Sequence, residues 1–172
     1  MSRRVAPSPV KVVVPYLPGM LQSGVVEAIT ADGYTPIMCA LDAHFAYGRL
    51  VAQLAEDGED VAIVEHDKIT RRGFLATFED CPEPWCCHRY ARPGHAAYDM
   101  DFPGFGHIRL RTEALHALRS LPLAETEWMN VDGDSTKWLQ RQGFTWHRHD
   151  GVVFHRHAIE ATRIRYPAGF GM

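Results

Sequence analysis

The run Val61-Ala62-Ile63-Val64 restricts the fold of this chain more than any other feature. Four consecutive aliphatic residues that end abruptly at Glu65 are typical of a short strand buried on both faces of a sheet. Such a strand needs helices above and below it, as in sheets built from parallel strands. The sequence therefore predicts an α/β fold.

Strands and helices alternate along the first part of the chain. Residues 11–14 and 34–41 predict strands, and residues 25–29 and 42–57 predict helices, the second with an apolar side chain every three or four positions. The order favours right-handed crossovers and a mixed, mostly parallel sheet flanked by helices. Ligands bind beyond the carboxyl ends of the strands in such sheets. The residues that follow each strand are therefore candidates for a functional site.

Four elements are predicted in the second half of the chain: a strand at 107–110, a helix at 112–118, a helix that begins at Asp134 or Ser135, and a hairpin of residues 144–149 and 152–155 turning at Asp150-Gly151. Residues 80–106 predict a long irregular stretch, and such loops usually serve function. We expect residues 1–9 to form a loose N-terminal lead-in segment without regular structure. We expect residues 158–172 to form a basic C-terminal tail. We expect one domain over residues 1–172.

Composition excludes several classes of protein. The chain has 172 residues, of which 46% are apolar and 23% charged, with a net charge of −3. This apolar fraction is enough to bury a core, which excludes a disordered chain. No apolar run approaches the roughly 18 residues of a spanning helix, and no secretion signal is recognised. We expect a cytoplasmic protein with reduced cysteines and no membrane insertion.

Two acidic residues, Glu65 and Asp67, directly follow the buried strand. Alternate side chains of an extended segment share one face, so these carboxylates point the same way and His66 points oppositely. Two like charges on one face favour a cation between them. Mg²⁺ and Mn²⁺ prefer oxygen ligands and keep positions open for phosphate oxygens. A solvated turn after a buried strand is the alternative.

The segment from Tyr47 to Asp67 resembles the hallmark region of GT-A glycosyltransferases, of the family 2 kind. In that family a helix carrying an arginine, a glycine turn and a buried strand lead into an Asp-x-Asp motif. Arg49, Gly58, Glu65 and Asp67 fall at the matching places, with glutamate replacing the first aspartate. The resemblance implies a GT-A-like (Rossmann-like) fold and transfer of a sugar from a nucleotide-sugar donor to an acceptor hydroxyl.

The resemblance continues from Asp132 to Gly143, which is similar to the family's second acidic motif, helix and glycine. It implies an inverting reaction in which an aspartate takes the acceptor's proton. The spacing favours Asp132 as this base. Asp134 is the alternative base, or a helix cap. The resemblance also implies a metal-bound histidine in the final hairpin, at His155 or at His157.

The resemblance therefore implies a Mn²⁺ or Mg²⁺ ion held by Asp67 and His155. Such an ion would offset the charge that builds on the leaving diphosphate. Donor binding is assigned to residues near the strand ends and to two from neighbouring segments: Pro15, Tyr16, Arg49, Glu65, His66, Asp67 and Gly106. Arg49 could instead pair with the acidic strand end, and Tyr16 could simply pack.

Other functions stay open on the sequence alone. Residues 137–172 hold six basic and two acidic residues, which suggests a nucleic-acid-binding module, or DNA with a modified base as acceptor, as in phage-type enzymes. A nucleotidyltransferase also uses paired acids, but it would carry a glycine-rich loop where residues 15–19 contain two prolines. A homo-oligomer is compatible with the sequence.

A zinc-stabilised structural module is a further alternative. It is suggested by four residues close together in the sequence: Cys81, Cys86, Cys87 and His88. Adjacent cysteines are poor ligand spacing, because neighbouring side chains diverge and two Cys-x-x-Cys pairs are absent.

Overall fold

The computed structural model describes residues 10–91 and 104–155. In chain order the elements are β1 (Lys11–Tyr16), α1 (Ser23–Ala31), β2 (Pro36–Ala40), α2 (Ala46–Asp57), β3 (Val61–Val64), β4 (Lys68–Ile69), α3 (Phe74–Asp80), β5 (Trp85–Ala91), β6 (His107–Leu110), α4 (Thr112–Leu118), the 3-10 helix η1 (Leu123–Glu125), α5 (Trp128–Arg141) and β7 (His147–His155). Among these helices, none combines the length and the apolarity needed to cross a bilayer.

The described strands form one sheet in the order β2-β1-β3-β6-β5-β7-β4. β1 pairs in parallel with β2 and β3, and β5 pairs in parallel with β7. β6 is antiparallel to β3 and β5, and β4 is antiparallel to β7. More residues pair in parallel than in antiparallel register, which confirms the mixed, mostly parallel α/β sheet.

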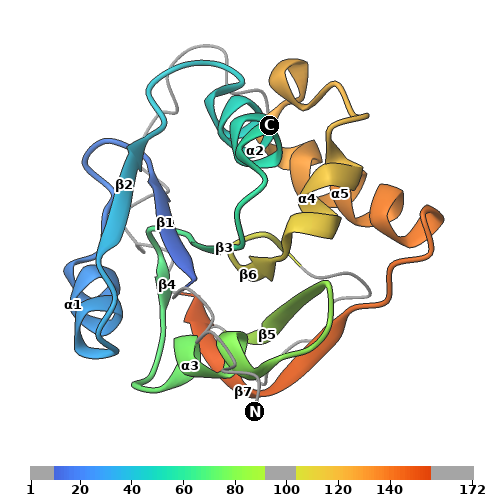
Figure 1. Cartoon of the computed structure of the whole chain (residues 1–172). Coiled ribbons are helices and arrows are strands. Elements are labelled where there is room, and N and C mark those ends of the chain that lie inside the picture. The colour runs from blue at the N-terminus through green and yellow to red at the C-terminus, as the bar shows by residue number, and fades with distance from the viewer. Residues whose placement is uncertain (1–9, 92–103, 156–172) are drawn as a thin grey trace.

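Helices cover both faces of the sheet. α2, α4 and α5 gather on one side of it, whereas α1 and α3 lie on the other (Figure 1). β3 contributes to both cores, as its apolar run predicts. Val61 and Ile63 pack with the core of α2, α4 and α5, and Ala62 and Val64 pack with the core of α1 and α3. All four side chains are fully buried, which explains why this strand has no polar position.

The stretch predicted to be irregular contains the strand β5, and the chain before it forms β4 and α3. β5 shows no alternation of polar and apolar residues because both of its faces are covered. Trp85 and Cys87 pack in the core of α2, α4 and α5, whereas Cys86 packs in the core of α1 and α3. A strand of this kind is not recognised from a period of two.

The predicted hairpin at residues 144–155 is wrong. Residues 147–155 form one strand, β7, which pairs with β5 on one side and β4 on the other. Asp150 and Gly151 have no register partner in β5 and form a bulge, with Gly151 at φ 120°. Pairing resumes beyond this bulge along β5, so the neighbouring strand keeps the segment extended where the sequence suggests a turn.

Several predicted boundaries also differ. α5 begins at Trp128, two turns before the predicted start, because Val131, Ser135 and Leu139 are buried along one side of it. Asp134 therefore lies inside the helix and does not cap it. α2 begins after Phe45 rather than at Asp42.

Gly48 marks the point where α2 packs closest to η1. A Cβ at this position would meet the carbonyl oxygens of Leu123 and Thr126, the latter at 2.7 Å. We expect Gly48→Ala to lower the free energy of unfolding by about 1–3 kcal/mol, because overpacking against backbone forces elements apart. Urea denaturation measures the change.

Gly133 in α5 is a matched control for this substitution. No described atom lies within 4 Å of a Cβ added there. Gly133→Ala should therefore raise the free energy of unfolding by up to ~1 kcal/mol, as helix propensity alone predicts. Two variants that change stability in the same direction would contradict the close packing of α2 on η1.

Candidate active site

The carboxyl ends of β1 and β3 meet, as the sequence predicts. The His66 N–H donates to the Pro15 carbonyl at 3.2 Å, and the Glu65 N–H donates to the Gly106 carbonyl at 2.8 Å. His66 is buried, its ring lies edge-on to Trp128 at 6.4 Å, and burial lowers its pKa. The structure therefore brings four predicted donor-binding residues together.

Lys68 is the centre of this arrangement. Its Nζ lies 3.0 Å from Glu65 Oε2 and 2.7 Å from Asp67 Oδ1, and its side chain is 3% exposed. Burial alone would lower the pKa of Lys68, but attraction to Glu65 and Asp67 outweighs burial and raises it. The positive charge between the two carboxylates is thus an ammonium group of the chain itself.

The backbone from Gly104 to His107 is held against this ion cluster. The Tyr90 hydroxyl donates to the Gly104 carbonyl at 2.7 Å and accepts from the His107 N–H at 2.7 Å. The Phe105 N–H donates to Asp132 Oδ2 at 3.1 Å. These bonds fix the segment that faces the strand ends.

Gly106 allows this close approach. A Cβ at Gly106 would lie 2.5 Å from Glu65 Oε2 and 2.6 Å from Lys68 Cε. A larger residue at this position would therefore push the Glu65 and Lys68 side chains out of their present arrangement, whereas glycine leaves the ion pair undisturbed.

Asp132 carries the most perturbed carboxyl of the cluster. It lies in α5, and its Oδ1 is inaccessible to solvent and has no hydrogen-bond partner among the described residues. Burial, followed by the negative charge of Glu65, raises the pKa of Asp132 to about 7, although the Phe105 N–H and Lys68 act in the opposite direction. A carboxyl of this kind can take up or release a proton near neutral pH.

Two predicted site residues lie elsewhere. Asp134 is exposed, because residues two apart in a helix point about 200° apart; it borders a surface pocket of about 280 Å³ together with Lys137. Arg49 is exposed and donates to the His44 carbonyl at 2.7 Å. The buried side of α2 contains its neighbours Tyr47 and Gly48, which leaves Arg49 on the outside.

Two further predicted residues are placed only in part. Tyr16 is half-buried at the end of β1, where its carbonyl accepts from the Leu41 N–H at 2.8 Å. Residue 155 pairs with Lys68 in the sheet, so its backbone lies beside the acidic strand end. The side chain of His155, like all of His157, lies outside the described residues, and metal binding by Asp67 and His155 stays a prediction.

The four residues proposed for structural zinc do not form one site. Cys86 and Cys87 point into the two different cores. The His88 ring stacks on Phe74 at 4.6 Å and its Nδ1 lies 3.2 Å from His107 Nδ1.

No protein-family model matches the sequence, and no curated protein matches it significantly. Two solved structures show a weak overall similarity to this chain. A197 from STIV has a TM-score of 0.47 at 11% identity, over 73% of this chain and 78% of its own. A putative glucose-1-phosphate thymidylyltransferase from Bacillus anthracis, in complex with a sucrose, has a TM-score of 0.46 at 11% identity, over 85% and 73%.

Asp132 should make stability depend on pH. Its pKa is about 7 in the folded protein and about 3.9 in an unfolded chain, so the folded state binds more protons between these values. Stability therefore falls as the pH rises through this window. Asp132→Asn removes the ionisable group and keeps an oxygen for the Phe105 N–H.

The free energy of unfolding of Asp132→Asn should exceed that of the parent by an amount that rises with pH. We expect this difference to be near zero at pH 4 and about 1–3 kcal/mol at pH 8. Urea titrations at several pH values measure it. The exposed Asp134→Asn should show no such trend. A constant difference between Asp132→Asn and the parent would mean that this carboxyl has an ordinary pKa.

Proposed function

We propose that this protein transfers a sugar from a nucleotide-sugar donor to an acceptor hydroxyl, with Asp132 as the general base. The observation that carries the proposal is the buried Asp132 carboxyl, with a pKa of about 7, beside the acidic end of β3. An acceptor hydroxyl is a weak nucleophile and needs a base of this kind within hydrogen-bond reach. The site also lies where α/β sheets bind ligands, beyond the ends of parallel strands.

The hydrogen bond from the Phe105 N–H holds Asp132 by Oδ2, and Oδ1 has no partner among the described residues. Because Oδ1 is covered in this structure, the acceptor must displace the groups that cover it before Oδ1 takes the acceptor's proton. In this inverting step the acceptor oxygen bonds to the anomeric carbon of the sugar. The bond from that carbon to the phosphate oxygen breaks, and the nucleoside diphosphate leaves with the electron pair. Gly106 and the end of β1 at Pro15 and Tyr16 would border the donor.

Charge supports a divalent ion at this site. Lys68 does not balance the full negative charge of the three acids at this site, which are Glu65, Asp67 and Asp132. Because the diphosphate of the donor is also anionic, a further cation is needed between the donor and these acids. Lys68 occupies the position between Glu65 and Asp67, so we assign the ion to Asp67, in the turn before β4, and to His155, the last residue of β7. Bound Mn²⁺ or Mg²⁺ would supply Lewis-acid stabilisation of the leaving diphosphate.

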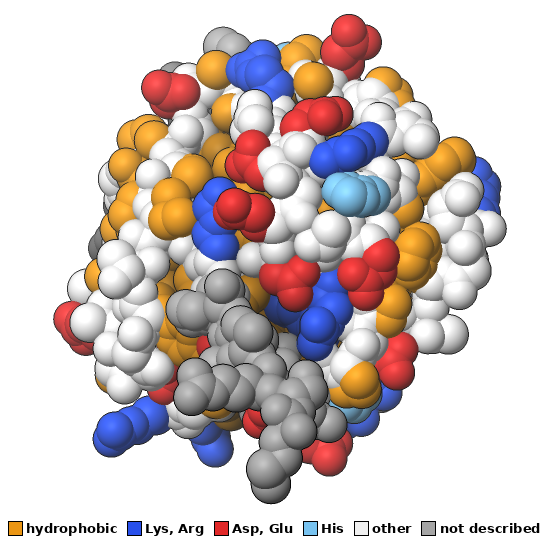
Figure 2. All heavy atoms as spheres, viewed as in Figure 1, with side chains coloured by type: hydrophobic (Ala, Val, Ile, Leu, Met, Phe, Trp, Pro, Cys, Tyr) orange, Lys and Arg blue, Asp and Glu red, His pale blue; other side chains and the backbone are white. Residues whose placement is uncertain are grey.

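A modified base in DNA remains a candidate acceptor. On the face shown in Figure 2, Lys and Arg side chains are interspersed with Asp and Glu, without one continuous basic surface. Residues 156–172, which include the whole predicted basic tail at 158–172, lie outside the described residues. DNA binding that weakens steeply with salt would support this acceptor.

We expect Asp132→Asn to bind the donor as the parent does and to lose at least ~100-fold in transfer rate, because the amide cannot take a proton. Thermal shifts with a panel of UDP- and GDP-sugars identify the donor. Release of nucleoside diphosphate from that donor then measures the rate, with Asp134→Asn as the matched control that retains activity.

Unchanged turnover in Asp132→Asn would eliminate Asp132 as the base. Formation of pyrophosphate from a sugar phosphate and a nucleoside triphosphate, without release of diphosphate from a nucleotide sugar, would instead make the protein a nucleotidyltransferase.

The thermal shift caused by the donor should require Mn²⁺ or Mg²⁺ and disappear in EDTA. Asp67→Asn keeps an acceptor for Lys68 but weakens a metal ligand, so it should lose most of the Mn²⁺-dependent shift. Glu59→Ala, at an exposed acid, is the control and should keep it. Equal shifts in Asp67→Asn and the parent would place the metal elsewhere.

A further inference from the structure

We propose that Cys81, His147 and His149 bind a zinc ion on the α1 and α3 face of the sheet. Cys81 directly follows α3, and the two histidines lie two residues apart in β7, where alternate side chains share a face. One ligand atom from each of the three residues lies within 4.8 Å of the others.

The spacing of these atoms is close to that of a zinc centre. Zn–S bonds of about 2.3 Å and Zn–N bonds of about 2.0–2.1 Å, at tetrahedral angles, place a sulfur and a nitrogen ligand roughly 3.6 Å apart. Cys81 Sγ lies 3.4 Å from His147 Nδ1. These two ligands are therefore already separated by one edge of the tetrahedron.

His149 provides an independent indication of a ligand. Its side chain is buried, the residue being 9% exposed, and its Nε2 has no hydrogen-bond partner among the described residues. A buried polar atom without a partner is costly. The imidazole of His149 would gain a partner if its ring rotated within this cluster or if one of its nitrogens bound a metal ion.

The position of Cys81 is fixed before any metal arrives. Its carbonyl accepts from the guanidinium groups of Arg109 at 2.9 Å and Arg111 at 2.6 Å. When zinc binds, the Cys81 thiol gives its proton to solvent and binds as thiolate, and this negative charge offsets part of the positive charge of the ion beside Arg109.

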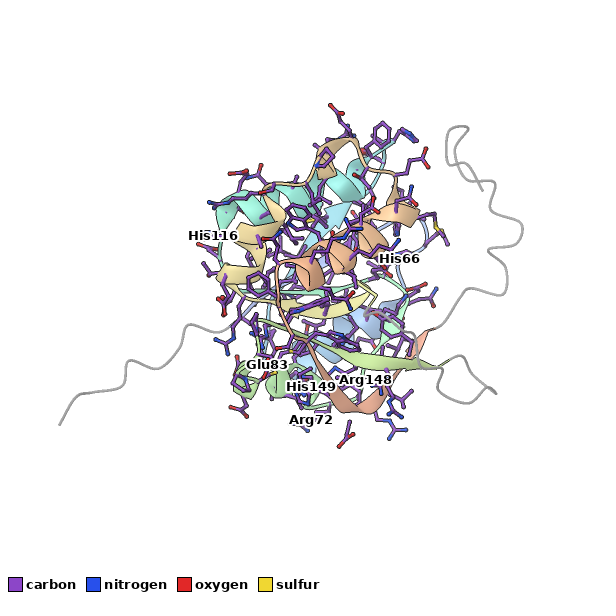
Figure 3. All side chains as sticks on the ribbon, turned by 90° about the vertical axis from the view of Figure 1, so that its right-hand side faces the viewer. His66, Arg72, Glu83, His116, Arg148 and His149 are labelled. Carbon is purple, nitrogen blue, oxygen red and sulfur yellow. The ribbon has the colours of Figure 1, made fainter. Side chains whose placement is uncertain are left out.

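The ligand types select the metal. A thiolate with two imidazoles suits zinc, whereas Mg²⁺ and Mn²⁺ prefer oxygen. His147 is exposed, so the fourth coordination position faces solvent and can hold water or an external ligand. In Figure 3, His149 lies in the lower half of the molecule and His66 in the upper half, so this site is distinct from the candidate active site.

The test uses the full chain without a histidine tag, stripped of metal and titrated with Zn²⁺ or Co²⁺. We expect tight binding of Zn²⁺ and, with Co²⁺, a thiolate-to-cobalt charge-transfer absorption that Cys81→Ser abolishes. His147→Gln should weaken Zn²⁺ binding at least about 10-fold. His116→Gln, at an exposed histidine of α4, is the matched control and should bind as the parent does.

His147 lies at the surface, so its variant keeps the test valid even if Cys81→Ser fails to fold. Three results would overturn the proposal: no uptake of Zn²⁺, equal affinity in His147→Gln and the parent, or an equal loss in His116→Gln. The donor-induced shift with Mn²⁺ is expected to persist in His147→Gln, so failure of the zinc site is distinguishable from failure of the transferase.

Discussion

A buried ammonium group organises the candidate active site. Lys68 bonds to two carboxylates that precede it in the sequence, Glu65 and Asp67, and leaving one partner of such a buried pair alone costs about 3–5 kcal/mol. The pair also determines what can surround it. A side chain at position 106 would displace the ion pair, and the Glu65 charge that Lys68 leaves incompletely balanced acts on Asp132 in α5. The end of β3, the segment before β6 and one face of α5 are thus tied to one cation.

The sheet separates two kinds of chemistry. Oxygen ligands gather at the strand ends on the side of α5, where a hard cation and phosphates are favoured. Sulfur and nitrogen ligands gather on the side of α3, where Cys81 meets His147. Because β3 and β5 contribute buried residues to both cores, the same strands support both groups without bringing them into contact. The two proposed sites, one suited to a hard ion and one to a soft ion, are thereby kept apart.

The sequence predicts the elements that have a strong pattern of apolar residues. It does not predict the strands whose conformation depends on the neighbouring strands with which they pair. The apolar run of β3 and the stripe of α2 are recognised from the residues alone, whereas β5 is hidden by its two buried faces, and β7 by a bulge that resembles a turn. In the site, the acids Glu65, Asp67 and Asp132 are predicted and do converge. Lys68 was missed because a lysine beside two acids is usually a solvated residue; its signal was that lysine is rare in this arginine-rich chain. His147 and His149 lie too far from Cys81 in sequence for their meeting to be predicted.

The pairing of β7 has a consequence for synthesis on the ribosome. β4 pairs with β7, and β5 has β7 along one edge, so both wait for a segment translated more than fifty residues after β5. Until then the nascent chain presents an open strand edge, which can pair with the wrong chain. β1, β2 and β3 lie closer together in the sequence and can pair with one another earlier, although the outer edge of β3 waits for β6. Lys68 lies at the start of β4, so its backbone pairs with β7 only late in synthesis. An incomplete chain would therefore expose Glu65 and Asp67 before β7 is available to hold Lys68, their counter-ion, in place.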